Sequence, residues 1–111
     1  MTKEENRKRI IDVGIVPVVR ASSSKQALQA AEALCKGGIP IVEITMTVPG
    51  AVDAIAQLAK TSVGMMVGAG TVLDAATAER CMDAGAQFIV SPGLDVATVN
   101  AAKARGILVM A

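Results

Sequence analysis

A glutamate in the middle of an apolar segment is the residue of this sequence best suited to chemistry. In the segment IPIVEITMTVPG, residues 39–50, β-branched residues flank Glu43 on both sides, a composition typical of a strand buried on both faces. Unpaired carboxylates are rare in protein interiors, and burial raises the pKa of a carboxyl group because it disfavours the charged form. A raised pKa suits proton transfer, so Glu43 is the first candidate for a catalytic acid or base.

Other polar side chains follow apolar runs at the points where strands are expected to end. Ligands of parallel α/β proteins bind beyond the carboxyl ends of the strands, so these residues are candidates for ligand contact. Structural explanations compete, because an arginine at a strand end is often a solvated surface group and threonine suits the pleat of a strand. Gly68 and Gly70 can simply form a turn, since GxG without a third glycine is a weak cofactor signal. Besides Glu43, the polar strand-end residues are Arg20, Thr45, Thr47, Thr71 and Ser91.

Apolar runs alternate with Ala-rich stretches of helical character in a regular rhythm. Successive runs start roughly 20 to 26 residues apart, as units of one strand and one crossover helix require. We therefore expect five strands joined by four helices, after a short charged N-terminal helix. The expected strands are residues 15–19, 39–45, 65–67, 88–90 and 107–110.

The expected helices carry their own start signals. The serines at 22–24 offer N-caps for the first crossover helix, and Pro49 suits the first turn of the second. Asp74 and Asp95 are N-cap candidates for the third and fourth. Each start signal fits the alternation of strands and helices.

Buried strands and one-sided helices predict an α/β fold with a parallel sheet, either open and doubly wound or closed into a barrel. Periodicity alone does not separate these two. The last run, GILVMA, has no cap, turn or polar tail after it. A (β/α)8 barrel needs about 200 residues or more. We therefore expect residues 1–111 to form a single domain, which in a barrel would hold about four and a half of the eight units.

Composition and charge argue against several classes of function. Lys plus Arg number 11 against 10 Asp plus Glu, and a net charge of +1 creates no field that would attract nucleic acid. The N-terminal segment lacks the apolar region of a signal peptide, and no apolar run approaches the length of a membrane span. We expect a cytoplasmic protein that binds neither nucleic acid nor membrane. Cys35 and Cys81 lie among apolar residues of helical patterns and are expected to be reduced structural thiols.

Two long motifs resemble a known family. VEITMTVPGAVDAIAQL and VGAGTVLDAATAERCMDAGAQFIVSPGLD are similar to the N-terminal half of the 2-keto-3-deoxy-6-phosphogluconate (KDPG) aldolase and 4-hydroxy-2-oxoglutarate (KHG) aldolase family, and the resemblance spans residues 10–111. It implies a (β/α)8 TIM barrel of which this chain covers about strands one to five and helices one to four.

The resemblance also implies an activity. Members are class I aldolases, usually homotrimers, that use a Schiff base to cleave the 2-keto acid KDPG into pyruvate and glyceraldehyde 3-phosphate, without metal or cofactor. The sequence agrees, because it contains no histidine and no clustered thiols that could bind a metal.

Site residues are implied by the same motifs. Glu43 is similar to the general acid/base of the family, Thr71 to a residue that helps to hold the pyruvate carboxylate, and Pro92 to a residue that lines the pyruvyl pocket. Arg20 resembles an arginine that points into the site in one branch of the family. Thr47 is a departure, because many members have arginine there in contact with the carboxylate. Carboxylate binding would then rely on Arg20, Thr71 and backbone N–H groups.

The Schiff-base lysine of the family, in a motif like VKxFP on strand six, has no counterpart here. All six lysines fall in the N-terminal segment or in expected helices. The phosphate-binding loops, expected after strands seven and eight, are also missing. We therefore expect this chain to be inactive alone.

Two alternatives stay open. One is an inactive half-barrel that serves as a structural or assembly module and associates through its exposed edge strands. The other is a different phosphate-binding (β/α)8 enzyme, such as an isomerase that uses Glu43 as its base. A lysine on the sixth strand would favour the aldolase over the isomerase.

Overall fold

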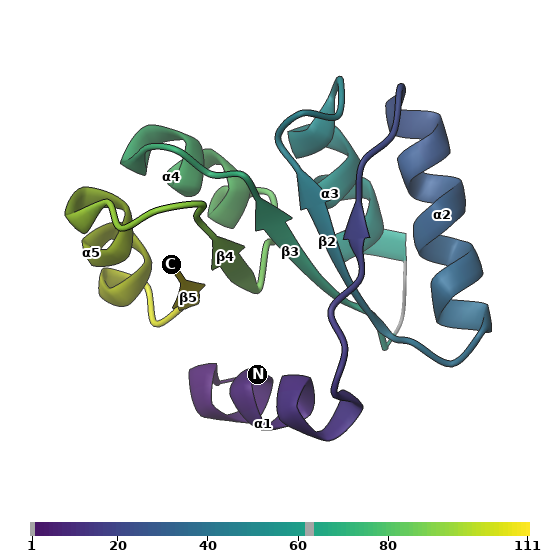
Figure 1. Cartoon of the computed structure of the whole chain (residues 1–111), viewed down its shortest axis with the longest axis horizontal. Coiled ribbons are helices and arrows are strands. Elements are labelled where there is room, and N and C mark those ends of the chain that lie inside the picture. The colour runs from purple at the N-terminus through teal and green to yellow at the C-terminus, as the bar shows by residue number, and fades with distance from the viewer. Residues whose placement is uncertain (1, 62–63) are drawn as a thin grey trace.

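The computed structural model describes residues 2–61 and 64–111, which form one parallel five-stranded sheet with helices around it (Figure 1). An N-terminal helix precedes the first strand, and strands and helices then alternate to the end. The helices are α1 Lys3–Val13, α2 Ser24–Lys36, α3 Ala51–Thr61, α4 Ala75–Asp83 and α5 Val96–Ala104. The strands are β1 Val18–Val19, β2 Ile41–Thr45, β3 Met66–Gly70, β4 Phe88–Val90 and β5 Leu108–Met110.

The order of the strands decides between the two predicted architectures. The sheet runs β1-β2-β3-β4-β5, and every neighbouring pair is parallel. Each right-handed crossover therefore advances the chain in the same direction, and α2 to α5 pack on the outer, convex side of the curved sheet (Figure 1). A doubly wound sheet would reverse direction and carry helices on both faces. The arrangement is that of a (β/α)8 barrel, of which five strands are present.

The two faces of the sheet have different neighbours. Side chains alternate along a strand, and in β2 Val42 and Ile44 belong to the larger core between the sheet and the helices. Ile41 belongs instead to a concave cluster with Met66 and Phe88. Partly buried side chains of α1 pack against this cluster, so α1 covers the concave face where the strands begin.

Side-chain caps begin three of the crossover helices where the sequence predicted them. The N–H of Gln26 donates to Ser23 Oγ at 3.1 Å at the start of α2. Asp74 accepts from the N–H of Thr77 at 2.7 Å, and Asp95 accepts from the N–H of Thr98 at 3.2 Å. Each bond satisfies one of the backbone donors that a helix leaves unpaired in its first turn.

Three predicted boundaries need correction. β3 continues to Gly70, so the GAG run lies inside the strand and does not form the turn after it. β1 contains only Val18 and Val19, since these two residues alone pair with β2. Pro49 lies in the turn before α3, because the first helical hydrogen bond runs from the N–H of Ala54 to the carbonyl of Gly50.

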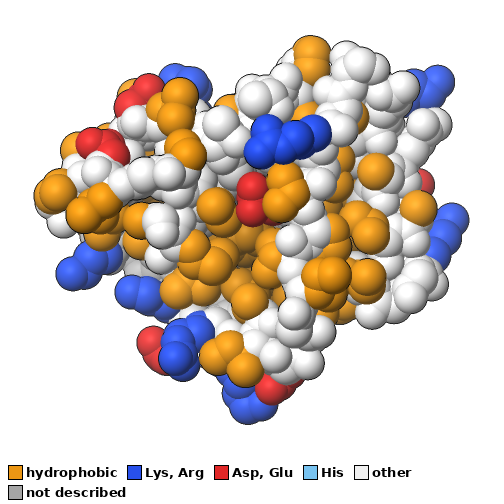
Figure 2. All heavy atoms as spheres, in the orientation of Figure 1, with side chains coloured by type: hydrophobic (Ala, Val, Ile, Leu, Met, Phe, Trp, Pro, Cys, Tyr) orange, Lys and Arg blue, Asp and Glu red, His pale blue; other side chains and the backbone are white. Residues whose placement is uncertain are grey.

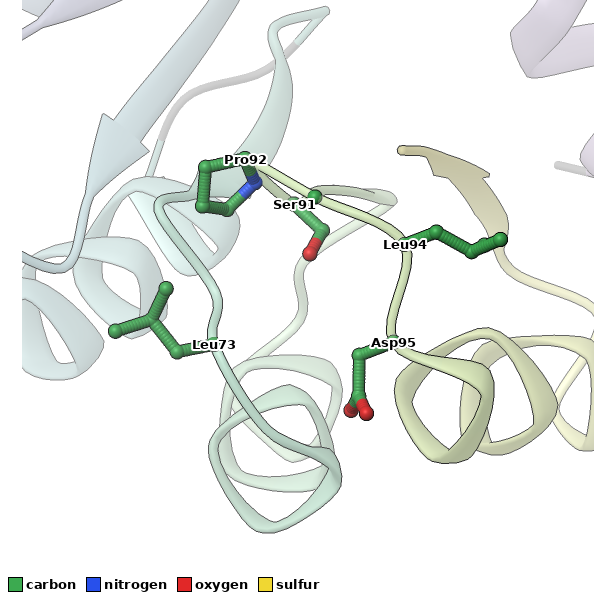
Figure 3. A pocket seen from close by; sticks show the side chains of 6 residues that line it. Leu73, Ser91, Pro92, Leu94 and Asp95 are labelled. Atoms are coloured by element: carbon green, nitrogen blue, oxygen red, sulfur yellow. The ribbon is translucent and has the colours of Figure 1, made fainter.

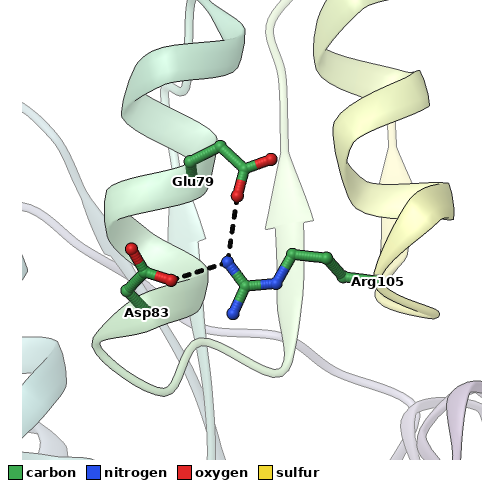
Figure 4. Close-up of polar contacts among 3 residues, drawn as sticks. All are labelled: Glu79, Asp83 and Arg105. Carbon is green, nitrogen blue, oxygen red and sulfur yellow. Dashed lines mark hydrogen bonds and ion pairs between the residues drawn. The ribbon is translucent and has the colours of Figure 1, made fainter.

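An arginine joins the last two helices. Arg105, directly after α5, donates from Nη1 to Glu79 at 3.0 Å and to Asp83 at 2.7 Å, both on α4 (Figure 4). Because all three side chains are solvent-accessible, this network adds little to stability.

Two further features of the described residues bear on the sequence predictions. Both cysteines are free, and burial raises the pKa of the Cys81 thiol to about 11, as expected of an unreactive structural thiol. Within residues 2–61 and 64–111, no helix combines the length and the apolar character needed to cross a membrane.

Phe88→Ala should strongly destabilise the fold. Phe88 is fully buried and is the largest side chain of the concave cluster, so its removal leaves a cavity. We expect a loss of about 3–5 kcal/mol in the free energy of unfolding, measured by denaturant titration. The control Ile11→Ala, at a position that is 61% exposed, should change it by no more than about 0.5 kcal/mol. Equal losses in the two variants would contradict this description of the core.

Candidate active site

Glu43 lies in the middle of β2, the strand next to the edge strand β1, and on the concave face of the sheet. It alternates with Val42 and Ile44, which face the helices, and it pairs in register with Val18 on β1 and Gly68 on β3. Its backbone N–H donates to the carbonyl of Pro17 at 2.9 Å. Only 6% of the residue is exposed. The concave position agrees with the expectation from the sequence.

Two glycines of β3 make room for side chains from neighbouring strands. A Cβ atom added to Gly70 would overlap the Glu43 carboxylate, and one added to Gly68 would overlap the ring of Phe88. Sequence analysis missed this role. A usable signal was present, because glycine within a strand often marks the close approach of another group, and these two glycines are spaced to share one face.

Burial and one nearby cation act in opposite directions on Glu43. Loss of contact with water raises the pKa of its carboxyl group above the ordinary value, and the positive charge of Arg20 lowers it by a smaller amount. Arg20 follows β1 directly and is exposed. Figure 2 shows a cationic and an acidic side chain next to each other above an apolar part of the surface. The effect of Arg20 on the pKa of Glu43 shows that its charge lies close enough to act on the buried carboxyl group.

Two threonine hydroxyls meet at the carboxyl end of β2. Thr45 is fully buried, and its Oγ1 lies 2.6 Å from Oγ1 of exposed Thr47. The Thr45 hydroxyl also lies 3.5 Å from the carbonyl oxygen of Val19, a longer contact. Thr47 is therefore held in the turn that follows β2, at the rim of the sheet. There it can offer a hydroxyl to a ligand but no charge.

Thr71 has an unusual backbone conformation. It directly follows β3, and its φ of 56° is the only positive φ of a non-glycine residue within the described chain. The left-handed region is costly for a β-branched residue, and such conformations often occur at functional sites. Because β2 and β3 are parallel, Thr71 after β3 and Thr47 after β2 lie at the same end of the sheet.

Pro92 lines a separate surface hollow. The hollow measures about 320 Å³ and lies between the loops after β3 and β4 (Figure 3). Its lining includes Ser91, whose N–H donates to the carbonyl of Met110 at 2.9 Å. Apart from Ser91 and Pro92, it includes none of the candidate residues for ligand contact. The structure therefore does not join Pro92 and Glu43 in one cavity.

No lysine lies on a strand in the part of the chain that the structure describes. All six lysines lie on helices α1, α2, α3 and α5, as expected from the sequence, and five of them are exposed. Among residues 2–61 and 64–111, no three His, Cys, Asp or Glu side chains are grouped so that they could hold a metal ion. The concave face thus offers a carboxylic acid, hydroxyls and an arginine.

Comparisons with known proteins agree with this fold. The family model of KDPG and KHG aldolase matches residues 7–110. The KHG/KDPG aldolase of Escherichia coli K12 is 41% identical over 88 residues, which cover 79% of this chain and 41% of that protein. This chain spans less than half the length of the curated relatives that it matches.

Two solved structures are similar over most of the chain. The KDPG aldolase of Zymomonas mobilis ZM4 with 3-phosphoglycerate has a TM-score of 0.78 at 37% identity, covering 86% of this chain and 45% of that one. The enzyme of Legionella pneumophila, with pyruvate captured as a covalent carbinolamine, has a TM-score of 0.78 at 34% identity, covering 86% and 46%. The parallel sheet and the match across residues 7–110 lead to one conclusion: the chain belongs to the KDPG and KHG aldolase family.

Proposed function

We propose that this chain forms the acid/base half of a class I aldolase site that cleaves KDPG to pyruvate and glyceraldehyde 3-phosphate. The observation that carries the proposal is the buried carboxyl group of Glu43, on the concave face of a partial barrel near the carboxyl ends of the strands. Family membership and the names of the relatives support the choice of substrate.

Glu43 acts as the proton carrier in this proposal. Formation of a carbinolamine, loss of water from it and cleavage of a carbon–carbon bond each need a proton to be moved at the reacting centre. A carboxyl group with a raised pKa keeps its proton closer to neutral pH and can both donate and accept it. Arg20 limits the rise, which keeps the carboxylate form accessible.

The carboxylate of the 2-keto acid is recognised by Arg20 and by the hydroxyls of Thr47 and Thr71. A guanidinium suits carboxylate binding because its N–H groups match the two oxygens. Thr47 is held by Thr45 at the rim of β2, and Thr71 follows the neighbouring strand. We assign Pro92 to the wall of the pyruvyl pocket, a role that rests on the family motif.

The Schiff-base amine comes from outside these 111 residues. A Schiff base forms from an unprotonated amine, whereas an exposed lysine, with a reference pKa of about 10.4, carries a free amine in only about one of two thousand molecules at pH 7. The lysines of this chain lie on helices, and none of them lies on a strand. The covalent carbinolamine of the Legionella pneumophila protein supports this type of chemistry for the family.

We propose further that the full-length protein is a homotrimer. We also propose that it is located in the cytoplasm, where free cysteines stay reduced. A second candidate function, a structural or assembly module, is favoured by the exposed side chain of Val18 at one edge strand and by the incomplete burial of β5 at the other. Exposed strand edges pair readily with other chains.

The stability of the chain should depend on pH through Glu43. The raised folded-state pKa means that the folded state binds this proton more tightly than the unfolded state, whose glutamate pKa is about 4.3. Stability is therefore fully present below about pH 4.3 and falls as pH rises through the folded-state pKa, by about 1.4 kcal/mol for each pH unit that separates the two values. Denaturant titrations from pH 4 to 8 should show this fall in the wild type and a smaller one in Glu43→Gln. Parallel curves would contradict the raised pKa.

Covalent trapping tests the origin of the amine. Incubation with pyruvate and then borohydride should give no stoichiometric adduct with this chain by mass spectrometry, because all six lysines lie on helices and none on a strand. The full-length Escherichia coli relative, as positive control, should trap one pyruvyl group. A single-site adduct on Lys36, Lys60 or Lys103 would overturn this assignment.

A hybrid enzyme tests the role of Glu43 directly. Residues 1–111, joined to the complementary part of the Escherichia coli relative, should cleave KDPG. In that hybrid, Glu43→Gln should lower kcat about 10²- to 10⁴-fold, as expected for the loss of a general acid/base. Glu32→Gln is the matched control, because Glu32 is exposed on α2. An unchanged kcat for Glu43→Gln would remove the proton-carrier role.

A further inference from the structure

The side chain of Glu43 does not lie beside its own backbone partner. In the register of β2 and β3, Glu43 pairs with Gly68, and Gly70 pairs with Thr45. The carboxylate nevertheless occupies the space over Gly70, where a Cβ atom would overlap Oε2 and come within 2.5 Å of Cδ. The side chain therefore leans along the sheet by about two residues, toward the carboxyl end of the strands.

An aromatic ring occupies the place that the carboxylate leaves. The ring of Phe88, on β4, fills the space over Gly68, and the residue is fully buried. Gly68 thus accommodates an apolar ring from one neighbouring strand, and Gly70 accommodates a carboxylate from the other. Because the ring blocks the space opposite Glu43, the gap over Gly70 is the place on β3 that stays open to the carboxylate.

We propose that Gly70 is a positioning residue for Glu43: by lacking a side chain, it lets the carboxylate lie over β3 near the mouth of the partial barrel. Phe88 completes the arrangement, because its ring fills the space over Gly68, two residues before Gly70 on β3. The catalytic consequence rests on the proposed function. The steric relation between Gly70 and Glu43 does not.

A methyl group at position 70 would push the carboxylate off β3. Phe88 blocks the direction toward Gly68, and the neighbour on the other side, Val18, is 49% exposed. The displaced carboxylate would therefore move toward water. Since burial is the main cause of the raised pKa of Glu43, displacement should bring that pKa back toward the ordinary range.

The first test is an NMR titration of the Glu43 carboxyl carbon in the 111-residue chain. We expect the pKa of Glu43 to lie above the ordinary value in the wild type and to fall in Gly70→Ala. Gly93→Ala is the matched control, because a Cβ there meets no atom within 4 Å and its φ is not in the left-handed region, so it should leave the pKa unchanged. A folded Gly70→Ala chain with an unchanged Glu43 pKa would overturn the proposal.

The second test is a double-mutant cycle at fixed protein concentration. Gly70→Ala should raise the unfolding equilibrium constant by about tenfold or more in the wild type and by no more than about threefold in Glu43→Ala, where the carboxylate is gone. Glu43→Gln keeps the size of the side chain and should not relieve the effect, which separates a steric cause from an electrostatic one. If Gly70→Ala fails to fold, Glu43→Ala/Gly70→Ala should fold. Equal effects of Gly70→Ala in all three backgrounds, or failure of the double variant too, would contradict the proposal.

The outcomes separate this inference from the proposed function. A hybrid enzyme without aldolase activity, together with a clear coupling between positions 70 and 43, would leave the positioning role intact and remove the proposed chemistry. An active hybrid whose Gly70→Ala variant keeps the Glu43 pKa and the wild-type kcat would support the proposed chemistry and remove the positioning role of Gly70.

Discussion

The pairing of β2 with β3 is the constraint on which the rest of the structure depends. All five residues of each strand are buried, and five consecutive pairs fix the register between them. A slip of one residue would turn Glu43 toward the helices and Val42 toward the concave face, so the apolar pattern itself fixes the position of the carboxyl group. The other strands extend this pair outward, and α1 packs where the strands begin.

Local sequence signals were sufficient for much of the fold. The cap residues Ser23, Asp74 and Asp95 act through neighbours three positions away, so their roles can be read from sequence. The GAG run was misjudged as a turn for the opposite reason. Gly68 and Gly70 are accommodated in a strand because side chains from β4 and β2 need the space, and those contacts join residues about 20 to 27 positions apart in the chain. The bounds of β1 likewise depend on pairing across the sheet, because only Val18 and Val19 pair with residues of β2.

In the candidate site too, some features could be predicted from local sequence and others could not. The position of Glu43 followed from one charged residue within an apolar run, which is a local feature. The bond between the hydroxyls of Thr45 and Thr47 and the positive φ of Thr71 required coordinates, because nothing in their residue types specifies them. Pro92 stays a prediction: the motif assigns it to the pyruvyl pocket, and in the structure it lines a hollow whose lining does not include Glu43.

The unequal burial of the strands has a consequence for how the molecule fluctuates. β2 and β3 are buried throughout, whereas every residue of β5 is only partly buried and β1 contains a single buried residue. Local opening costs least where few apolar contacts are lost, so amide hydrogens should exchange with solvent fastest at the two margins and slowest in the central pair. β3 and β4 separate β5 from β2, but Leu108 and Met110 pack against the concave cluster that contains Phe88, so opening of β5 would reach the surroundings of Glu43 through that cluster.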